Sequence, residues 1–269
     1  QRTDEKSLDI RVSVVTDLDI RAFEYYVDTT EIQNKHTPPT FYQIKDDFIT
    51  DRTGEKYDTS NLRGMTFTNQ DDLKRTIKSV INFYGIVKSI EDKIKDWSIK
   101  LNPSNIDEIR IEKERSIEAN ITNQNVKAFV NDKWTLEYDL AFDSDLQNSF
   151  AQAVVIAKKI KSSELYFENL IDAEGNFALP PDDSERPEDS LSNQVEKLKG
   201  EGSPEAIAYN IFKPFISNDS PSKAVTAQIF SELLLKDRVK NRGILEQSKS
   251  LKYIVNAIKY ACNEDDSDA

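Results

Sequence analysis

The sequence predicts an α/β fold in which a mostly parallel sheet is flanked by helices, with helical insertions and a helical C-terminus. Two short apolar segments rich in β-branched residues, at 8–15 (LDIRVSVV) and 126–130 (VKAFV), are typical of buried strands. Long helical patterns lie between these segments and after them. Strands separated by long helical crossings favour a parallel sheet.

The region between the two strands carries one weak pattern and one strong pattern. Residues 36–70 are polar and contain Pro38-Pro39, so we expect a loop with short elements there. At 71–97, apolar residues recur every three or four positions. That spacing predicts an amphipathic helix.

Helical patterns dominate the sequence after the second strand. Thr135 is expected to cap a helix, and another helix is predicted at 146–160. The acidic, proline-rich segment at 179–190 (LPPDDSERPEDS) predicts a solvated linker. Three further helices are predicted beyond it, at 204–216, 223–235 and 248–261.

These patterns predict three regions. The first is a core at 1–178 that contains a helical insertion at about 68–120. A linker follows at 179–200, and the helices at 201–269 are expected to complete the functional site.

The composition narrows the class of protein. The net charge of −12 argues against a general nucleic-acid coat, because such proteins need surplus Lys and Arg to displace counterions from phosphate. Acidity does not exclude a nuclease, since divalent cations need clustered carboxylates. One cysteine and one histidine exclude a disulfide framework and make acyl-transfer chemistry implausible. No stretch approaches the roughly 18 to 20 apolar residues of a membrane span, so we expect a cytoplasmic protein without a membrane partner.

Two carboxylates follow the first predicted strand. Asp17 and Asp19 stand where ligands of parallel sheets bind, and residues 133–139 take the same place after the second strand. Two acids at a buried strand end are costly unless something compensates them, and hard divalent cations prefer such oxygen ligands. The alternative is that both acids cap a helix at 21–27.

Three segments resemble the TOPRIM domain of OLD (overcoming lysogenization defect) family ATP-dependent endonucleases. They are VVTDLDI at 14–20, VKAFVNDKWTLEYDLA at 126–141 and SKAVTAQIFSELL at 222–234. The first resembles the strand with the D-x-D motif, the second the strand with the family's TLEYDL signature, and the third the K-x-x-x-A helix start. Some relatives of this family, such as Gabija nucleases, serve in phage defence.

The resemblance implies a metal-dependent DNA endonuclease. Asp17 and Asp19 would bind Mg²⁺ or Mn²⁺ in a two-metal site, and Glu137 would supply another carboxylate. Asp139 is a weaker candidate, because residues i and i+2 of a helix face apart. Lys223 would neutralise charge on the scissile phosphate, which makes Asp17, Glu137 and Lys223 the expected catalytic set. The negative charge of Glu137 could instead interact favourably with the positive end of its own helix dipole. The same dipole effect disfavours a lysine at a helix start, such as Lys223.

The sequence also departs from the family. TOPRIM domains carry a glutamate on an earlier strand, and the polar segment QRTDEKS at 1–7 does not supply one. The family's N-terminal ATPase is also missing, so ATP would act only through that domain. We therefore expect a fragment that lacks the first TOPRIM strand and has little activity alone. The expected partners are DNA, the ATPase domain and further copies of the intact protein.

Two other classes of function remain open. A haloacid-dehalogenase-like phosphatase would use Asp17 as nucleophile and Asp19 as general acid/base. That class needs a Thr or Val soon after the second acid, which Ile20-Arg21-Ala22 does not offer. The other class is a non-catalytic acidic interaction module.

Overall fold

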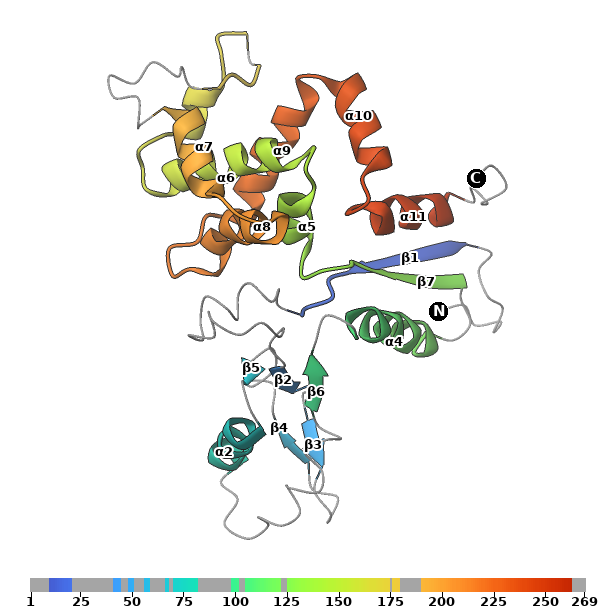
Figure 1. The fold of residues 1–269 in the computed structure, drawn as a ribbon. Helices are drawn as coiled ribbons and strands as arrows, with labels where there is room; N and C mark the ends of the chain where they lie inside the picture. Colours follow the sequence, from blue (N-terminus) through green and yellow to red (C-terminus); the bar gives the residue numbers. More distant parts are fainter. Residues whose placement is uncertain are drawn as a thin grey trace. The chain divides into compact units, whose positions relative to one another are not determined.

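The computed structural model describes the ranges 10–20, 41–44, 48–50, 56–58, 66–67, 70–81, 98–101, 105–121, 125–174, 176–179 and 190–262. Their elements form a mixed α/β protein that is mostly helical and has a small parallel sheet (Figure 1). The chain divides into two compact units. The larger contains residues 1–18 and 113–269, and the smaller contains residues 19–112.

The smaller unit combines short antiparallel strands with helix α2 (Gln70–Ile81) and the beginning of a second helix, α4 (Ile106–Ala119). Leu73 and Ile77 of α2 are fully buried, as the apolar periodicity predicts. The rest of the predicted helix, at 82–97, lies outside the described residues. Three strands form a sheet in the order β5-β2-β6, and β3 pairs with β4. Their bounds are Phe41–Ile44 (β2), Phe48–Thr50 (β3), Lys56–Asp58 (β4), Thr66–Phe67 (β5) and Ser98–Leu101 (β6).

The larger unit contains the parallel pair that the sequence predicts, although the first strand is not buried as expected: none of its six residues is buried, and Val12 and Val15 are exposed. Strand β1 (Arg11–Thr16) runs beside β7 (Asn125–Val130), with Arg11 opposite Asn125 and Thr16 opposite Val130. Parallel strands bring their carboxyl ends to the same edge of a sheet. The residues that follow Thr16 and Val130 are therefore neighbours, although more than a hundred positions separate them.

Helices pack on this sheet and protect one of its edges. Phe129 is buried with Tyr253 and Ala257 of α11 (Lys252–Ala261). Along the outer edge of β7, two glutamates of α4 (Ile106–Ala119) accept backbone hydrogen bonds. Glu118 accepts from the Ala128 N–H at 2.9 Å, and Glu114 accepts from the Val130 N–H at 3.1 Å. These contacts satisfy backbone groups that an edge strand would otherwise expose.

Helix α6 (Gln147–Lys161) is central to the helical part of the unit, packed against α9, α7 and α5. Seven of its residues are buried, which exceeds the single apolar side that the sequence predicts. The surrounding elements are α5 (Leu136–Phe142), η2 (Phe167–Leu170), α7 (Leu191–Lys199), α8 (Pro204–Phe212), η4 (Lys213–Ile216), α9 (Lys223–Leu235) and α10 (Arg238–Gln247).

An aromatic cluster fixes the start of α5 against α8. The Trp134 ring centroid lies 4.5 Å from that of Phe212 and 6.0 Å from that of Tyr138. Tyr138 and Phe212 meet edge to face at 5.8 Å. Burial of three aromatic rings in this geometry anchors the segment that follows β7.

The structure adds helices that the sequence patterns do not predict, among them α7 and α10. Helix α7 lies within the expected linker at 179–200, because Ser190 caps it and Leu191 and Val195 are buried. The proline-rich part of that linker, at 180–189, lies outside the described residues. Helix α10 has no buried residue. A helix without a buried side needs no apolar periodicity, so the sequence carries no signal for it.

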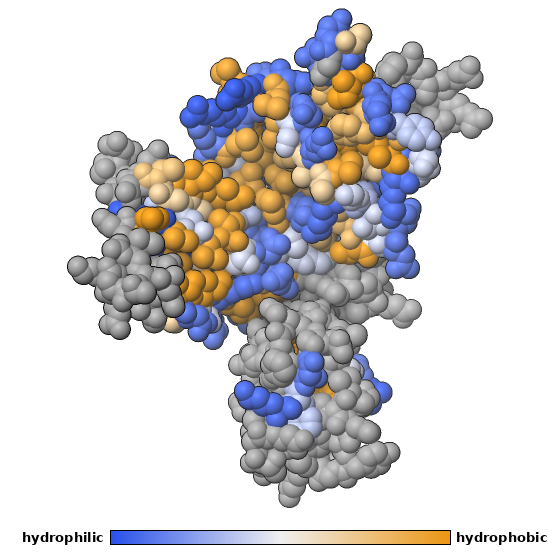
Figure 2. Space-filling model, turned by 180° about the vertical axis from the view of Figure 1, so that it is seen from behind, coloured by the Kyte–Doolittle hydropathy of each residue, from blue (hydrophilic) through white to orange (hydrophobic). Residues whose placement is uncertain are grey.

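The surface of the described residues mixes apolar and hydrophilic groups (Figure 2). Val239 is 88% exposed and Ile258 is 59% exposed. No helix within the described ranges has the length and apolar content needed to cross a membrane.

Candidate functional site

The carboxyl ends of β1 and β7 are joined by Asn131, the first residue after β7. Its backbone N–H donates to the Thr16 carbonyl at 3.3 Å. Its side-chain oxygen accepts from the Leu18 N–H at 2.5 Å. Asn131 is fully buried, so these bonds fix the turn after β1 and with it the position of Asp17.

Asp17 bonds to the start of helix α5. Its Oδ1 accepts from the Leu136 N–H at 3.0 Å, across 119 positions of sequence. The first N–H groups of a helix have no partner within the helix, and a carboxylate there also meets the positive end of the helix dipole. The Lys113 Nζ donates to the Asp17 carbonyl at 2.5 Å. Asp17 therefore caps α5; the helix at 21–27 that the capping alternative invokes lies outside the described residues.

Glu137 lies in the first turn of α5 between two donors. The Thr135 hydroxyl, which caps the helix as predicted, donates to Glu137 Oε2 at 2.9 Å. The Lys223 Nζ forms an ion pair with Glu137 Oε1 at 2.9 Å. The Glu137 side chain is 20% exposed and that of Lys223 is 55% exposed. A lysine at the first position of α9 is disfavoured by the helix dipole, and the carboxylate of Glu137 compensates this charge.

Asp139 is the most buried carboxylate at this end of the sheet. Asn131 Nδ2 donates to its Oδ2 at 2.9 Å, while Oδ1 is buried without a hydrogen-bond partner. Burial raises the pKa of Asp139 to about 7; the Asn131 hydrogen bond and Lys133 oppose this rise, and the charges of Asp132 and Asp17 add to it. A buried carboxylate with one unpaired oxygen is costly in its charged form.

Tyr253 of α11 faces the same group of acids. Burial raises the pKa of its hydroxyl well above the ordinary tyrosine value, and the charges of Asp139, Asp17, Glu137 and Asp132 raise it further. Four carboxylates thus lie within electrostatic reach of one hydroxyl. The sequence carries no signal for Tyr253. Asn131 could have been found, because it is a polar residue directly after a buried strand.

Asp19 is exposed and has a φ of 63°, in the left-handed region that Asp tolerates better than most residues. It is the first residue of the smaller unit. Its expected role as a metal ligand stays a prediction.

The donor chemistry of this site suits a hard divalent cation. Asp17, Glu137 and Asp139 offer only carboxylate oxygens, and Asp139 Oδ1 has no hydrogen-bond partner. Within the ranges that the structure describes, no three His, Cys, Asp or Glu residues are grouped so that they could hold a metal ion. The acids are held instead by Leu136, Lys223 and Asn131. A cation that binds Glu137 Oε1 has to displace the Lys223 ammonium group.

Lys223 also lines a pocket of about 540 Å³ between α6 and α9. Lys161 and Ser222 lie on its wall, and the Lys161 Nζ donates to the Ser220 carbonyl at 2.7 Å. The pocket gives the Lys223 end of the ion pair an open side.

Comparison with known proteins gives no relative: no protein-family model, curated protein or solved structure matches this chain. The functional argument therefore depends on the residues themselves.

Proposed function

We propose that this chain is the TOPRIM-like nuclease part of an OLD-type, metal-dependent DNA endonuclease. The observation that carries the proposal is the meeting of residues 17, 137 and 223 at the start of α5, through the Asp17–Leu136 hydrogen bond and the Glu137–Lys223 ion pair. These residues come from the three separate segments that resemble the family. Phosphodiester hydrolysis needs both carboxylates for cations and a positive group for the phosphate.

Each residue has a proposed role. Asp17, Glu137 and Asp139 would hold Mg²⁺ or Mn²⁺, with Asp19 as a further ligand. Bound divalent cations would supply an activated water and offset charge on the leaving oxygen. The Lys223 Nζ, once released from Glu137, would approach the phosphate oxygens. The raised pKa of Tyr253 keeps its hydroxyl protonated at neutral pH, so it would donate a hydrogen bond rather than act as a base.

The proposal extends to partners. DNA is the proposed substrate, and ATP would act through an ATPase domain on the same parent protein. The intact protein would be a cytoplasmic homo-oligomer, and phage defence is its proposed setting by resemblance to Gabija nucleases.

Calorimetric titration with Mn²⁺ tests the metal site in the chain as it is. We expect saturable binding that strengthens as pH rises through about 7, because Asp139 has to lose its proton. Asp17→Asn keeps an acceptor for the Leu136 N–H and removes only the charge, so it should fold and lose Mn²⁺ binding. Asp145→Asn changes an exposed carboxylate of the same unit and serves as the matched control.

The outcomes separate the classes of function. Unchanged Mn²⁺ binding in both Asp17→Asn and Glu137→Gln would favour the non-catalytic module. With Mn²⁺ bound, hydrolysis of a phosphodiester in preference to a phosphomonoester supports the nuclease, whereas the reverse preference supports the phosphatase. Because the isolated chain is expected to be poorly active, the hydrolysis assay should also be run on the chain joined to its ATPase.

A further inference from the structure

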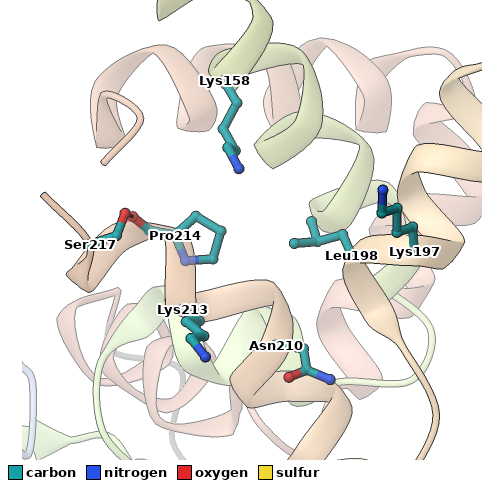
Figure 3. Close-up of a pocket in the computed structure, with 7 residues that line it drawn as sticks. All are labelled: Lys158, Lys197, Leu198, Asn210, Lys213, Pro214 and Ser217. Atoms are coloured by element: carbon teal, nitrogen blue, oxygen red, sulfur yellow. Dashed lines mark hydrogen bonds between the residues drawn. The ribbon is translucent and has the colours of Figure 1, made fainter. Parts of the chain in front are cut away.

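A lysine-lined pocket lies away from the sheet, where α6, α7 and η4 meet. It has a volume of about 400 Å³. Figure 3 shows Lys158 extending from its helix toward the open centre, with Leu198 on one side and Pro214 on the other. Lys197 and Lys213 complete its basic lining.

The charge of this pocket is unusual for so acidic a protein. Three lysines line it, and among the described residues on its wall there is no carboxylate. Lys158 and Lys197 lie in the last turns of α6 and α7, where a positive charge interacts favourably with the negative end of the helix dipole. Lys213, from a third element, also lines the pocket, although Figure 3 shows its side chain directed away from the open centre. Three lysines on the lining of one pocket favour an anion as the occupant.

The backbone around the pocket is fixed. Asn210 Nδ2 donates to the Lys199 carbonyl at 2.9 Å and so ties α8 to the end of α7. Gly200, between those helices, has a φ of 63°, and a Cβ there would lie 3.0 Å from Asn210 Nδ2. Pro214 is buried on the opposite wall. The lysines therefore stand on a preformed wall.

The basic surface continues along α6 toward Lys223. An adjoining pocket of about 430 Å³ shares Lys158 and Lys197 and adds Lys159. Two acids also line this pocket: Asp219 forms an ion pair with Lys161 at 3.1 Å, and Glu164 accepts from the Ser162 hydroxyl at 2.8 Å and keeps its negative charge. Lys161 then lines the pocket that contains Lys223. Several lysines along α6 and α7 suit a polymer with repeated phosphates better than a single small anion.

We propose that Lys158, Lys197 and Lys213 bind the phosphodiester backbone of DNA, and that Lys159 and Lys161 continue this track to Lys223. The inference rests on the proposed nuclease function, because it assigns the path by which the substrate reaches the site. Lysines that contact backbone phosphates fix the position of DNA without reading its sequence.

The test measures DNA binding by fluorescence anisotropy, with a short labelled duplex, in EDTA and over a series of salt concentrations. The pocket variant is Lys158→Gln/Lys197→Gln/Lys213→Gln. Its matched control is Lys240→Gln/Lys249→Gln/Lys252→Gln, which changes the net charge equally at exposed positions of the same unit. We expect the pocket variant to bind at least about 10-fold more weakly. The slope of log K against log salt should fall by about 0.9 for each phosphate that the protein no longer neutralises.

The control variant should bind within about 3-fold of the wild type, and a Lys→Arg triple variant of the pocket should retain binding. Equal weakening by the pocket and control variants overturns the proposal, as does no weakening by either. Displacement of the duplex by inorganic phosphate, but not by sodium chloride at equal ionic strength, would assign the pocket to a small anion instead. The anisotropy assay in EDTA needs neither a bound metal ion nor hydrolysis, so failure of the nuclease and failure of this track are distinguishable.

Discussion

The carboxyl end of the β1–β7 sheet and the lysine pocket carry opposite charges, and the protein holds them differently. At the sheet, Asp139 is buried and Asp17 accepts a hydrogen bond from the start of α5. Changing either carboxylate therefore also changes the contacts that stabilise the fold. At the pocket, the three lysine residues are exposed, on a wall set by Asn210 and Pro214. Changes at the sheet should therefore alter stability and chemistry together, whereas changes at the pocket should alter binding alone.

The largest effect should come from removing the aromatic support beneath α5. Trp134→Ala deletes a side chain that is 6% exposed and contacts Tyr138 and Phe212. We expect the free energy of unfolding to fall by about 3–5 kcal/mol in urea denaturation. Trp134→Phe, which keeps an aromatic ring, should lose less. Equal losses in the two variants would show that the ring contacts do not support α5.

The next largest effect is a pH dependence that arises from Asp139. Its folded-state pKa of about 7 lies above the ordinary 3.8, so the folded state binds more protons between these values. The contribution of this carboxyl to stability is complete below the lower value and is lost as pH rises through about 7, by up to ~4 kcal/mol. Urea unfolding in EDTA at about pH 5 and about pH 8 measures the part of this loss that falls above pH 5, about 3 kcal/mol.

The matched variant for that experiment is Asp139→Asn, which cannot ionise. It should flatten the pH dependence while Asp145→Asn leaves it unchanged. If wild type and Asp139→Asn lose the same stability over the interval, the buried carboxyl is not the group that titrates.

A smaller effect is expected at the cap of α5. Thr135→Ala removes the bond from the Tyr138 N–H and the bond to Glu137 Oε2. The unfolding free energy should fall by about 1 kcal/mol, as for other helix caps. Thr135→Ser keeps the hydroxyl and should restore most of the lost unfolding free energy. Thermal unfolding of both variants measures this difference. A serine variant as unstable as the alanine variant would contradict the cap's role.

The smallest effect on stability should follow from Lys223→Gln. The ion pair with Glu137 is more than half exposed on the lysine side, so its loss should cost less than about 1 kcal/mol. Under the proposed function, phosphodiester hydrolysis should nevertheless fall steeply, because the phosphate loses its positive partner. Hydrolysis that persists at the wild-type rate would exclude Lys223 from the chemistry.

Local sequence patterns predicted the elements that position the site. The β-branched runs indicated both parallel strands, and Thr135 marked the start of α5. The helical pattern at 223–235 also predicted α9, which the structure begins at Lys223 after the capping residue Ser222. These features depend on neighbours within a few residues, which a sequence displays directly.

Features that depend on distant contacts were not predictable in this way. The sequence offered a following helix as the partner of Asp17, whereas its carboxylate bonds to Leu136. Nothing in the sequence near Tyr253 indicates that four acids lie around its hydroxyl. Likewise, Glu114 and Glu118 protect the edge of β7 although their helix has no buried residue.

Anomalous diffraction from crystals soaked in Mn²⁺ tests the central claim most directly. The account predicts a manganese peak at the carboxyl end of β1 and β7, coordinated by Asp17 and by Glu137 or Asp139, with the Lys223 ammonium group withdrawn from Glu137. Absence of a peak at this end of the sheet under saturating Mn²⁺, with the Glu137–Lys223 ion pair intact, would contradict it.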